Sequence, residues 1–189
     1  WEALETSFFG RRPDFRLPPS SLEYAVSITA SLAHYFIAQR RAVGYASAGQ
    51  TFTVHQAERS ERQEARILET LAFVEANGNL SLAALVAAQA SQLPQGSTTV
   101  LITPTVHSEL LLAVDDLRRR FLRPIVILLD IQTFGGMRGT EKLARSLHER
   151  RVPVCVIACD ADLKQALSTL TTDFTPQEIR TWQNPILSL

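Results

Sequence analysis

Oxygen-bearing side chains stand at the ends of several apolar runs, where they could bind a cation. These positions are Glu5, Ser7, Thr103, Asp130 and Asp160. If the runs are parallel strands, their carboxyl ends share one edge of a sheet, which is where ligands bind in such folds. Carboxylate and hydroxyl oxygens suit Mg²⁺, a hard cation. The alternative is that these residues only end strands and cap the helices that follow.

A glycine-rich loop suggests a second kind of chemistry. Gly135, Gly136 and Gly139 lie between the apolar run Pro124–Asp130 and the next expected helix. Free N–H groups in a loop of this kind can bind phosphate. The spacing is not that of a dinucleotide-binding fingerprint, which follows a first strand. A tight turn is the other reading.

No strong catalytic motif is present in the sequence. There is no P-loop, no Gly-x-Ser-x-Gly and no His-Glu-x-x-His, and the four histidines have no ligand spacing. Cys155 and Cys159 are four residues apart on an expected strand, about 13 Å, so they cannot form a disulfide. We therefore expect a protein that is not an enzyme and has two free thiols.

The composition bounds the class of protein. Nineteen basic and nineteen acidic residues cancel, so net charge gives no reason to expect nucleic-acid binding. No apolar stretch approaches the roughly 20 residues that cross a bilayer. The chain opens directly on a strand candidate without an initiator Met. We therefore expect it to be a piece of a longer protein.

The pattern of apolar residues predicts an α/β fold in one domain, residues 1–189. Thr98–Thr103, Pro124–Asp130 and Pro153–Ala158 read as strands that alternate with helices, so we expect a doubly wound, mostly parallel sheet, Rossmann-like in class. Ala42–Ser47 and Gln50–His55 read as an antiparallel hairpin at its edge. Further strands and helices are expected at Trp1–Thr6, Ser20–Arg40, Arg62–Ala76, Ser81–Leu93, Ser108–Phe121, Thr140–Arg151 and Asp162–Leu170.

Two local signals are expected to delimit helices. Ser20 and Glu23 form a capping-box pattern at the start of the first helix. Asn77-Gly78-Asn79 reads as the C-terminal cap and turn between two later helices.

The loop Ser7–Pro19 is a candidate partner-binding element. It combines aromatic side chains with arginines, as interface hot spots do. These residues are Phe8, Phe9, Arg11, Arg12, Phe15 and Arg16. Alternatively, the phenylalanines fold back onto the core.

A second group of arginines falls at or just after the expected helix C-termini. They are Arg40, Arg41, Arg118, Arg119, Arg120, Arg123, Arg150 and Arg151. Cations at these places offset the helix dipole. The same rim could also face an anionic membrane surface.

Four runs resemble a known family in order and spacing: Leu22–Phe36 (LEYAVSITASLAHYF), Thr98–Thr105 (TTVLITPT), Val126–Gly136 (VILLDIQTFGG) and Val152–Leu167. The chain resembles the bacterial von Willebrand factor A-like proteins called domain of unknown function fifty-eight, which are associated with MoxR-type AAA+ ATPases. The resemblance implies a von Willebrand factor A-like fold. It also implies a cytoplasmic domain of an inner-membrane-anchored protein whose anchor lies upstream.

The same resemblance implies where a metal site would lie. Von Willebrand factor A domains bind Mg²⁺ through Asp-x-Ser-x-Ser, a later Thr and a later Asp. The corresponding positions here are Glu5, Ser7, Ser81 and Thr103. Phe9 stands where the motif has a second Ser, and Pro104 beside Thr103 offers no ligand. We therefore expect a degenerate site and no cofactor, with Mg²⁺ as an alternative.

The function expected from these observations is a non-catalytic protein-interaction module, an adaptor or partner of a MoxR-type AAA+ ATPase. A nucleotide-binding protein or enzyme that uses the Gly135–Gly139 loop is one alternative. A weak metal-dependent ligand binder is another.

Overall fold

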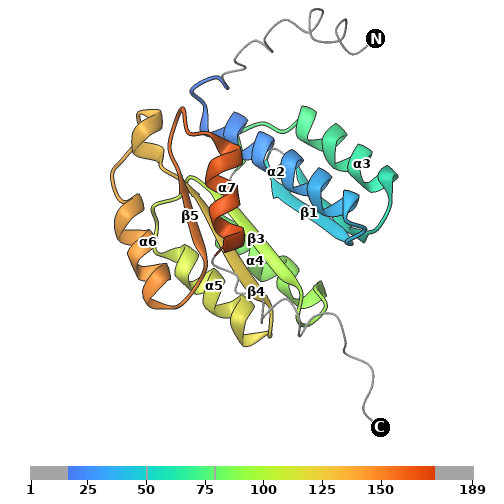
Figure 1. Ribbon diagram of the computed structural model, residues 1–189. Helices are drawn as coiled ribbons and strands as arrows, with labels where there is room; N and C mark the ends of the chain where they lie inside the picture. The colour runs from blue at the N-terminus through green and yellow to red at the C-terminus, as the bar shows by residue number, and fades with distance from the viewer. Residues whose placement is uncertain (1–16, 50, 79, 173–189) are drawn as a thin grey trace, which may run out of the picture.

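Three apolar runs form a parallel sheet. The computed structural model describes residues 17–49, 51–78 and 80–172. In it, β3 (Thr98–Thr103), β4 (Arg123–Leu129) and β5 (Val154–Ile157) lie in the order β3-β4-β5, and all three are parallel (Figure 1). The central strand β4 is apolar on both faces because helices cover both.

Alternate residues of these strands pack into two separate cores. Leu101, Val126 and Leu128 pack with helices α4 (Leu82–Gln89), α5 (Glu109–Arg119) and α6 (Thr140–Glu149). Ile127 and Leu129 point the other way, toward α2 (Ser21–Ala38) and α7 (Leu163–Thr172). Two short 3₁₀ turns, η1 (Ala90–Gln92) and η2 (Ile131–Phe134), complete this half. The expected βαβ arrangement with helices on both faces is therefore present.

The hairpin forms a sheet of its own. β1 (Val43–Ala48) pairs antiparallel with β2 (Phe52–Glu58), with Ala46 opposite Val54. Helices α2 and α3 (Glu61–Ala72) cover one face of this pair, where a small core forms. Within the described residues neither β1 nor β2 is hydrogen-bonded to the parallel sheet. The α/β, Rossmann-like character is as expected, but the hairpin is not joined to the edge of a single sheet.

One buried amide fixes α3 to both strands of the hairpin. Gln63 is 1% exposed, and its Nε2 donates to the carbonyl oxygens of Val43 (2.9 Å) and Gln56 (2.7 Å). A buried polar group of this kind is stable only when it is hydrogen-bonded. Gln63 therefore holds the open end of the hairpin against the helix.

Two of the expected helix signals are wrong. The Ser20 side chain makes no capping hydrogen bond, so the capping box is not formed, whereas Ser60 and Ser81 do cap α3 and α4. Helix α3 ends at Ala72, well before Gly78. Gly78 instead allows a close backbone approach: a Cβ there would lie 2.6 Å from the Gly49 carbonyl oxygen.

Three helices end in the same way, each with a non-glycine residue in the left-handed region. Arg40 (φ 59°), Phe121 (φ 60°) and Arg151 (φ 56°) follow α2, α5 and α6. At the end of α5, the N–H of Phe121 donates to the Arg118 carbonyl and that of Leu122 to the Leu117 carbonyl, which is the Schellman pattern. The other two ends have the same pair of bonds.

The C-termini of α5 and α6 lie next to each other. The Arg118 guanidinium donates to the Arg150 carbonyl oxygen at 2.7 Å, and Arg150 lies 3.9 Å from the Asp115 carboxylate. The sequence places arginines at both of these helix ends, and the structure brings them into contact. Whether that rim meets a membrane stays a prediction. Among the described residues no helix is both long and apolar enough to span a bilayer.

Replacing Arg151 with glycine should stabilise the domain. The left-handed conformation costs a non-glycine residue about 1–2 kcal/mol, and the extra freedom of glycine in the unfolded chain offsets about 0.5–1 kcal/mol of the gain. We expect Arg151→Gly to raise the free energy of unfolding by about 0.5–1 kcal/mol in urea titration. Arg145→Gly, at an exposed position inside α6, is the control and should lower it by about 1 kcal/mol. Equal losses for the two variants would contradict this account.

Removing the Gln63 amide should destabilise the hairpin. Gln63→Leu keeps the apolar volume but leaves two carbonyls without their donor, so we expect a loss of about 2 kcal/mol. Gln56→Ala is a matched control, because the exposed Gln56 side chain can change while its carbonyl remains. Urea titration should show an effect within about 0.5 kcal/mol for the control. A Gln63→Leu variant as stable as the parent chain would refute the role assigned to the amide.

Candidate functional site

A pocket of about 240 Å³ opens at the carboxyl end of β3, beside the start of α4 and of α5. Its lining residues are Ser81, Leu82, Ala83, Thr103, Thr105, His107, Glu109 and Leu110. This pocket lies at the edge of the sheet on which the sequence places a ligand site. Hydroxyl groups, one imidazole and one carboxylate supply its polar chemistry.

Two of the four positions expected for a metal site meet at this pocket. Ser81 and Thr103 both line it, although they are far apart in the sequence. Each hydroxyl already accepts a backbone hydrogen bond, Ser81 from the N–H of Ala84 (3.2 Å) and Thr103 from that of Thr105 (3.1 Å). They therefore act as caps for the local backbone. Glu5 and Ser7 lie outside the described residues.

The oxygens present in this pocket do not fit Mg²⁺ by themselves. That ion requires near-octahedral oxygen ligands and usually one or two carboxylates. Glu109 is the only carboxylate among the residues that line the pocket, and it is exposed. Among the described residues no group of three or more His, Cys, Asp and Glu side chains could hold a metal. The lining residues therefore supply hydrogen-bonding groups rather than a cation site.

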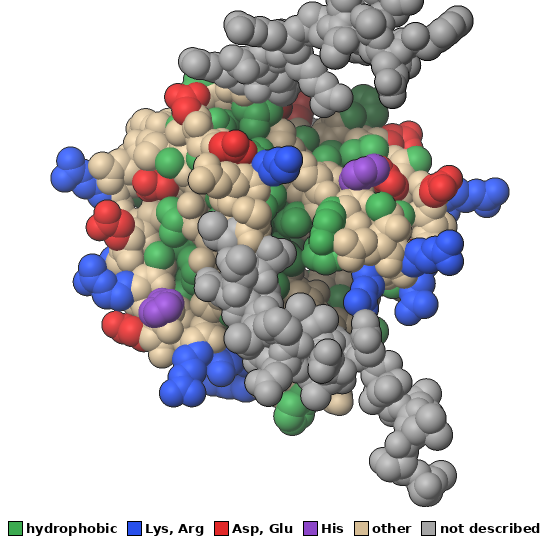
Figure 2. Space-filling model, in the orientation of Figure 1, with side chains coloured by type: hydrophobic (Ala, Val, Ile, Leu, Met, Phe, Trp, Pro, Cys, Tyr) green, Lys and Arg blue, Asp and Glu red, His purple; other side chains and the backbone are tan. Residues whose placement is uncertain are grey.

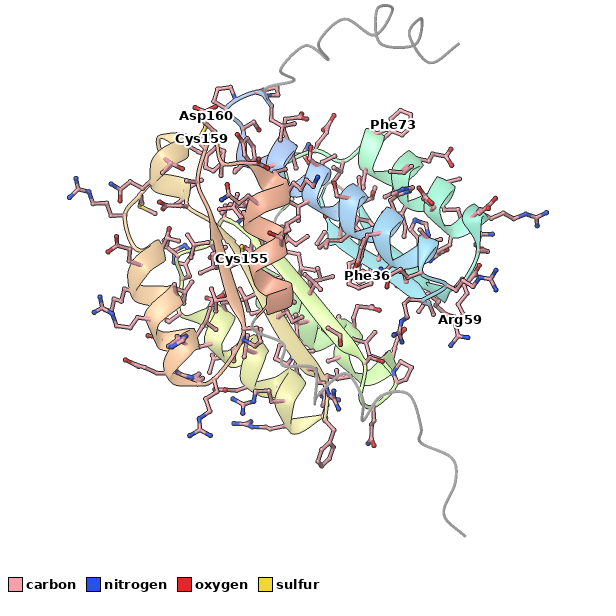
Figure 3. The ribbon with its side chains drawn as sticks, viewed as in Figure 1. Phe36, Arg59, Phe73, Cys155, Cys159 and Asp160 are labelled. Carbon is pink, nitrogen blue, oxygen red and sulfur yellow. The ribbon has the colours of Figure 1, made fainter. Side chains whose placement is uncertain are left out.

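Asp130 and Asp160 lie at the same edge, one strand apart, and their loops are tied together. The Thr133 hydroxyl donates to the Asp130 carbonyl oxygen (2.7 Å) and accepts from the N–H of Cys159 (2.8 Å). The N–H of Asp160 donates to the hydroxyl of Tyr24 on α2 (2.7 Å). Figure 3 shows Cys159 and Asp160 together beyond the end of β5. These bonds shape the edge and use its backbone donors.

The glycine loop is built as a turn. The N–H groups of Gly135 and Gly136 donate to the carbonyl oxygens of Gln132 and Ile131, so they are not free for phosphate. Gly135 has φ +86° and ends η2. Gly139 has φ +148°, and a Cβ there would lie 3.1 Å from Val106. The glycines are thus explained by backbone conformation and close approach.

Several residues of this edge are not among the sequence candidates. Thr105, His107 and Glu109 line the pocket, and Tyr24 and Thr133 hold the loops. The polar stretch after the strand Thr98–Thr103 is a signal for the first three. Nothing in the sequence connects Tyr24 with Asp160, which is 136 residues away. The aromatic and arginine candidates Phe8, Phe9, Arg11, Arg12, Phe15 and Arg16 lie outside the described residues.

Comparisons of the chain with protein-family models, with curated proteins and with solved structures find no match. The family resemblance therefore rests on the sequence runs quoted above.

The two thiols should differ sharply in reactivity. Cys155 is buried in β5 beneath α7 (Figure 3), and its Sγ contacts the Ala166 carbonyl oxygen at 3.4 Å. Burial raises the pKa of the Cys155 thiol above its usual value, whereas Cys159 is partly exposed. At pH 8 we expect a disulfide reagent to modify Cys159 rapidly and Cys155 only through unfolding.

The raised pKa also sets the sign of a pH effect. The unfolded chain can ionise Cys155 near pH 9, while the folded chain keeps the thiol protonated. The free energy of unfolding should therefore fall as the pH rises above that value.

In the modification experiment, Cys159→Ser is the control and should abolish the fast reaction. Two equally fast thiols in the parent chain would contradict the structure.

Proposed function

We propose that the domain is a non-catalytic protein-interaction module and that its partner is a MoxR-type AAA+ ATPase. The single observation that carries the proposal is where the exposed aromatic side chains lie. Five described aromatic residues of Tyr and Phe type are exposed, and four of them fall between residues 35 and 73. They are Tyr35, Phe36, Phe52 and Phe73, and the fifth is Phe121. Exposed aromatic residues are enriched at protein interfaces.

The exposed aromatic residues come from α2, from β2 and from the end of α3, which together with β1 form what we call the hairpin half of the domain. Phe73, at the end of α3, is 81% exposed, and Figure 3 shows it directed away from the domain. Phe52 is 49% exposed and points from the same face of β2 as the exposed Val54. Tyr35 and Phe36 pack edge to face with ring centroids 5.3 Å apart. The number of exposed aromatic side chains on this half favours recognition of another protein.

The other surfaces give less support to an enzyme. Figure 2 shows Lys and Arg side chains mainly around the periphery of the view and hydrophobic ones toward its middle. At the strand edge the hydroxyls of Ser81, Thr103 and Thr133 and the N–H groups of Gly135 and Gly136 all have local partners. The choice of a MoxR-type ATPase rests on the family resemblance, with which the Rossmann-like α/β character is consistent.

Direct binding tests the proposal. The purified domain would be immobilised and titrated with the MoxR-type ATPase from the same organism, with Phe73→Ala and Phe52→Ala as test variants. We expect Phe73→Ala to weaken binding at least about tenfold, or about 1.4 kcal/mol. Leu112→Ala on α5 is the matched control, because Leu112 is 69% exposed and lies outside the hairpin half.

Two results would count against the proposal. Binding of the parent chain that is no tighter than that of an unrelated protein would exclude this partner. Equal binding by the parent, Phe73→Ala and Phe52→Ala chains, or a larger loss for Leu112→Ala, would exclude the aromatic surface. Far-UV circular dichroism should first show that all variants are folded.

A further inference from the structure

The starts of the three parallel strands share one edge of the domain with the C-termini of α5 and α6 (Figure 1). The N–H of Gly96 donates to the Phe121 carbonyl oxygen at 2.9 Å, which ties the loop before β3 to the end of α5. The contact between Arg118 and the Arg150 carbonyl joins the end of α6 to the same place. We call this side of the domain, formed by residues 96–97, 115–123 and 148–151, the amino edge.

The amino edge carries an excess of positive charge in a chain whose net charge is zero. Segments 115–123 and 148–151 contain six arginines and three carboxylates. Two of the carboxylates already pair with arginines, Asp116 with Arg120 and Asp115 with Arg150. Three exposed arginines form no ion pair within the described part of the chain. They are Arg118, Arg119 and Arg151. The edge therefore presents a positive field to whatever lies against it.

Phe121 places an aromatic ring among these arginines. Its side chain is 71% exposed. Its backbone is left-handed, with φ 60°, just after α5, where glycine is the usual residue. This conformation is unfavourable for a bulky side chain, and glycine would make the same backbone hydrogen bonds at a lower cost. Neither core packing nor the end of the helix requires a ring here, so a strained and exposed Phe121 points to a role in binding.

An exposed ring surrounded by arginines suits the surface of a bilayer. At such a surface cations lie at the level of the lipid phosphates, and aromatic rings enter the boundary with the acyl chains. Single-stranded nucleic acids bind through several stacking rings, whereas Phe121 is the one aromatic residue of the amino edge. An acidic protein segment would use the arginines and leave the ring in water. A bilayer with anionic lipids uses both kinds of side chain.

We propose that the amino edge binds the surface of an anionic lipid bilayer, with the Phe121 ring at the interface and Arg118, Arg119 and Arg151 facing the lipid phosphates. Each arginine close to an anionic surface strengthens binding about fivefold. Because a few such terms add up to modest affinity, the docking is reversible and sensitive to salt. The carboxyl edge of the sheet, with its pocket, points away from the bilayer. This inference does not depend on the proposed ATPase partner.

Vesicle sedimentation with the full chain tests the proposal. Vesicles of phosphatidylcholine alone would be compared with vesicles of phosphatidylcholine and phosphatidylglycerol in equal parts. We expect binding to the anionic vesicles only, and weaker binding as salt is added. At physiological salt the double variant Arg119→Gln/Arg151→Gln should lower the partition coefficient at least about tenfold. Arg138→Gln/Lys142→Gln removes the same charge from exposed side chains at the other edge, so its effect should stay below about twofold.

The variant Phe121→Gly separates binding from stability. Glycine relieves the left-handed conformation, so this variant should be at least as stable as the parent chain in urea titration. It should nevertheless bind the anionic vesicles at least about fivefold more weakly, because the apolar ring is lost. Phe73→Ala is the matched control, since Phe73 is 81% exposed in the hairpin half, and it should bind the vesicles as the parent does.

Several results would overturn the proposal. One is equal binding to the neutral and the anionic vesicles, or no binding to either. Another is an equal loss for the two double variants, which would assign binding to net charge rather than to the amino edge. Unchanged vesicle binding by Phe121→Gly would remove the ring from the interface. Binding of a single-stranded oligonucleotide or of polyglutamate by a chain that does not bind vesicles would assign the edge to a nucleic acid or to an acidic protein.

Discussion

The packing of α2 against both sheets is the constraint on which the rest of the structure depends. One stripe of the helix, with Tyr24 and Ile28, packs on the parallel sheet, and another, with Ala33, packs on α3 and β1. A helix with two buried stripes has apolar residues over most of its circumference, as the sequence of α2 shows. Small side chains such as Ala30 let the second layer come close. The position of the hairpin, and hence of its aromatic residues, follows from this one helix.

The carboxyl edge of the parallel sheet is held by its own polar groups. Hydroxyls that could bind a ligand instead accept hydrogen bonds from backbone N–H groups, as at Ser81, Thr103 and Thr133. A group that is already partnered gains little by exchanging that partner for a ligand. The exposed aromatic side chains are in contact with solvent, and Tyr35 and Phe36 also pack against each other. Recognition through apolar contacts is therefore better supported by this surface than chemistry at the sheet edge.

The sequence predicts a strand best where helices cover both faces of that strand. Thr98–Thr103 was predicted with its observed bounds, because a strand covered on both faces is continuously apolar. Asp130 directly follows β4, and Asp160 lies three residues beyond the end of β5. The left-handed residues Arg40, Phe121 and Arg151 could not be predicted, since the usual signal for that conformation is glycine. The separation of the hairpin from the parallel sheet has no local signal in the sequence, because it depends on how α2 and α4 pack against both sheets.

That separation has a consequence for how the chain folds. Most of the hairpin half is contiguous in sequence, from Ser21 to Ala72, and the parallel half is contiguous from Leu82 to Thr172. Contacts within each half close short loops, which form quickly. In the described part of the chain no ladder hydrogen bonds join the two sheets, and the side chains of α2 and α4 couple the halves. Cooperativity between them therefore depends on the docking of two helices, so the hairpin half is the natural unit for partial, reversible opening of the native protein.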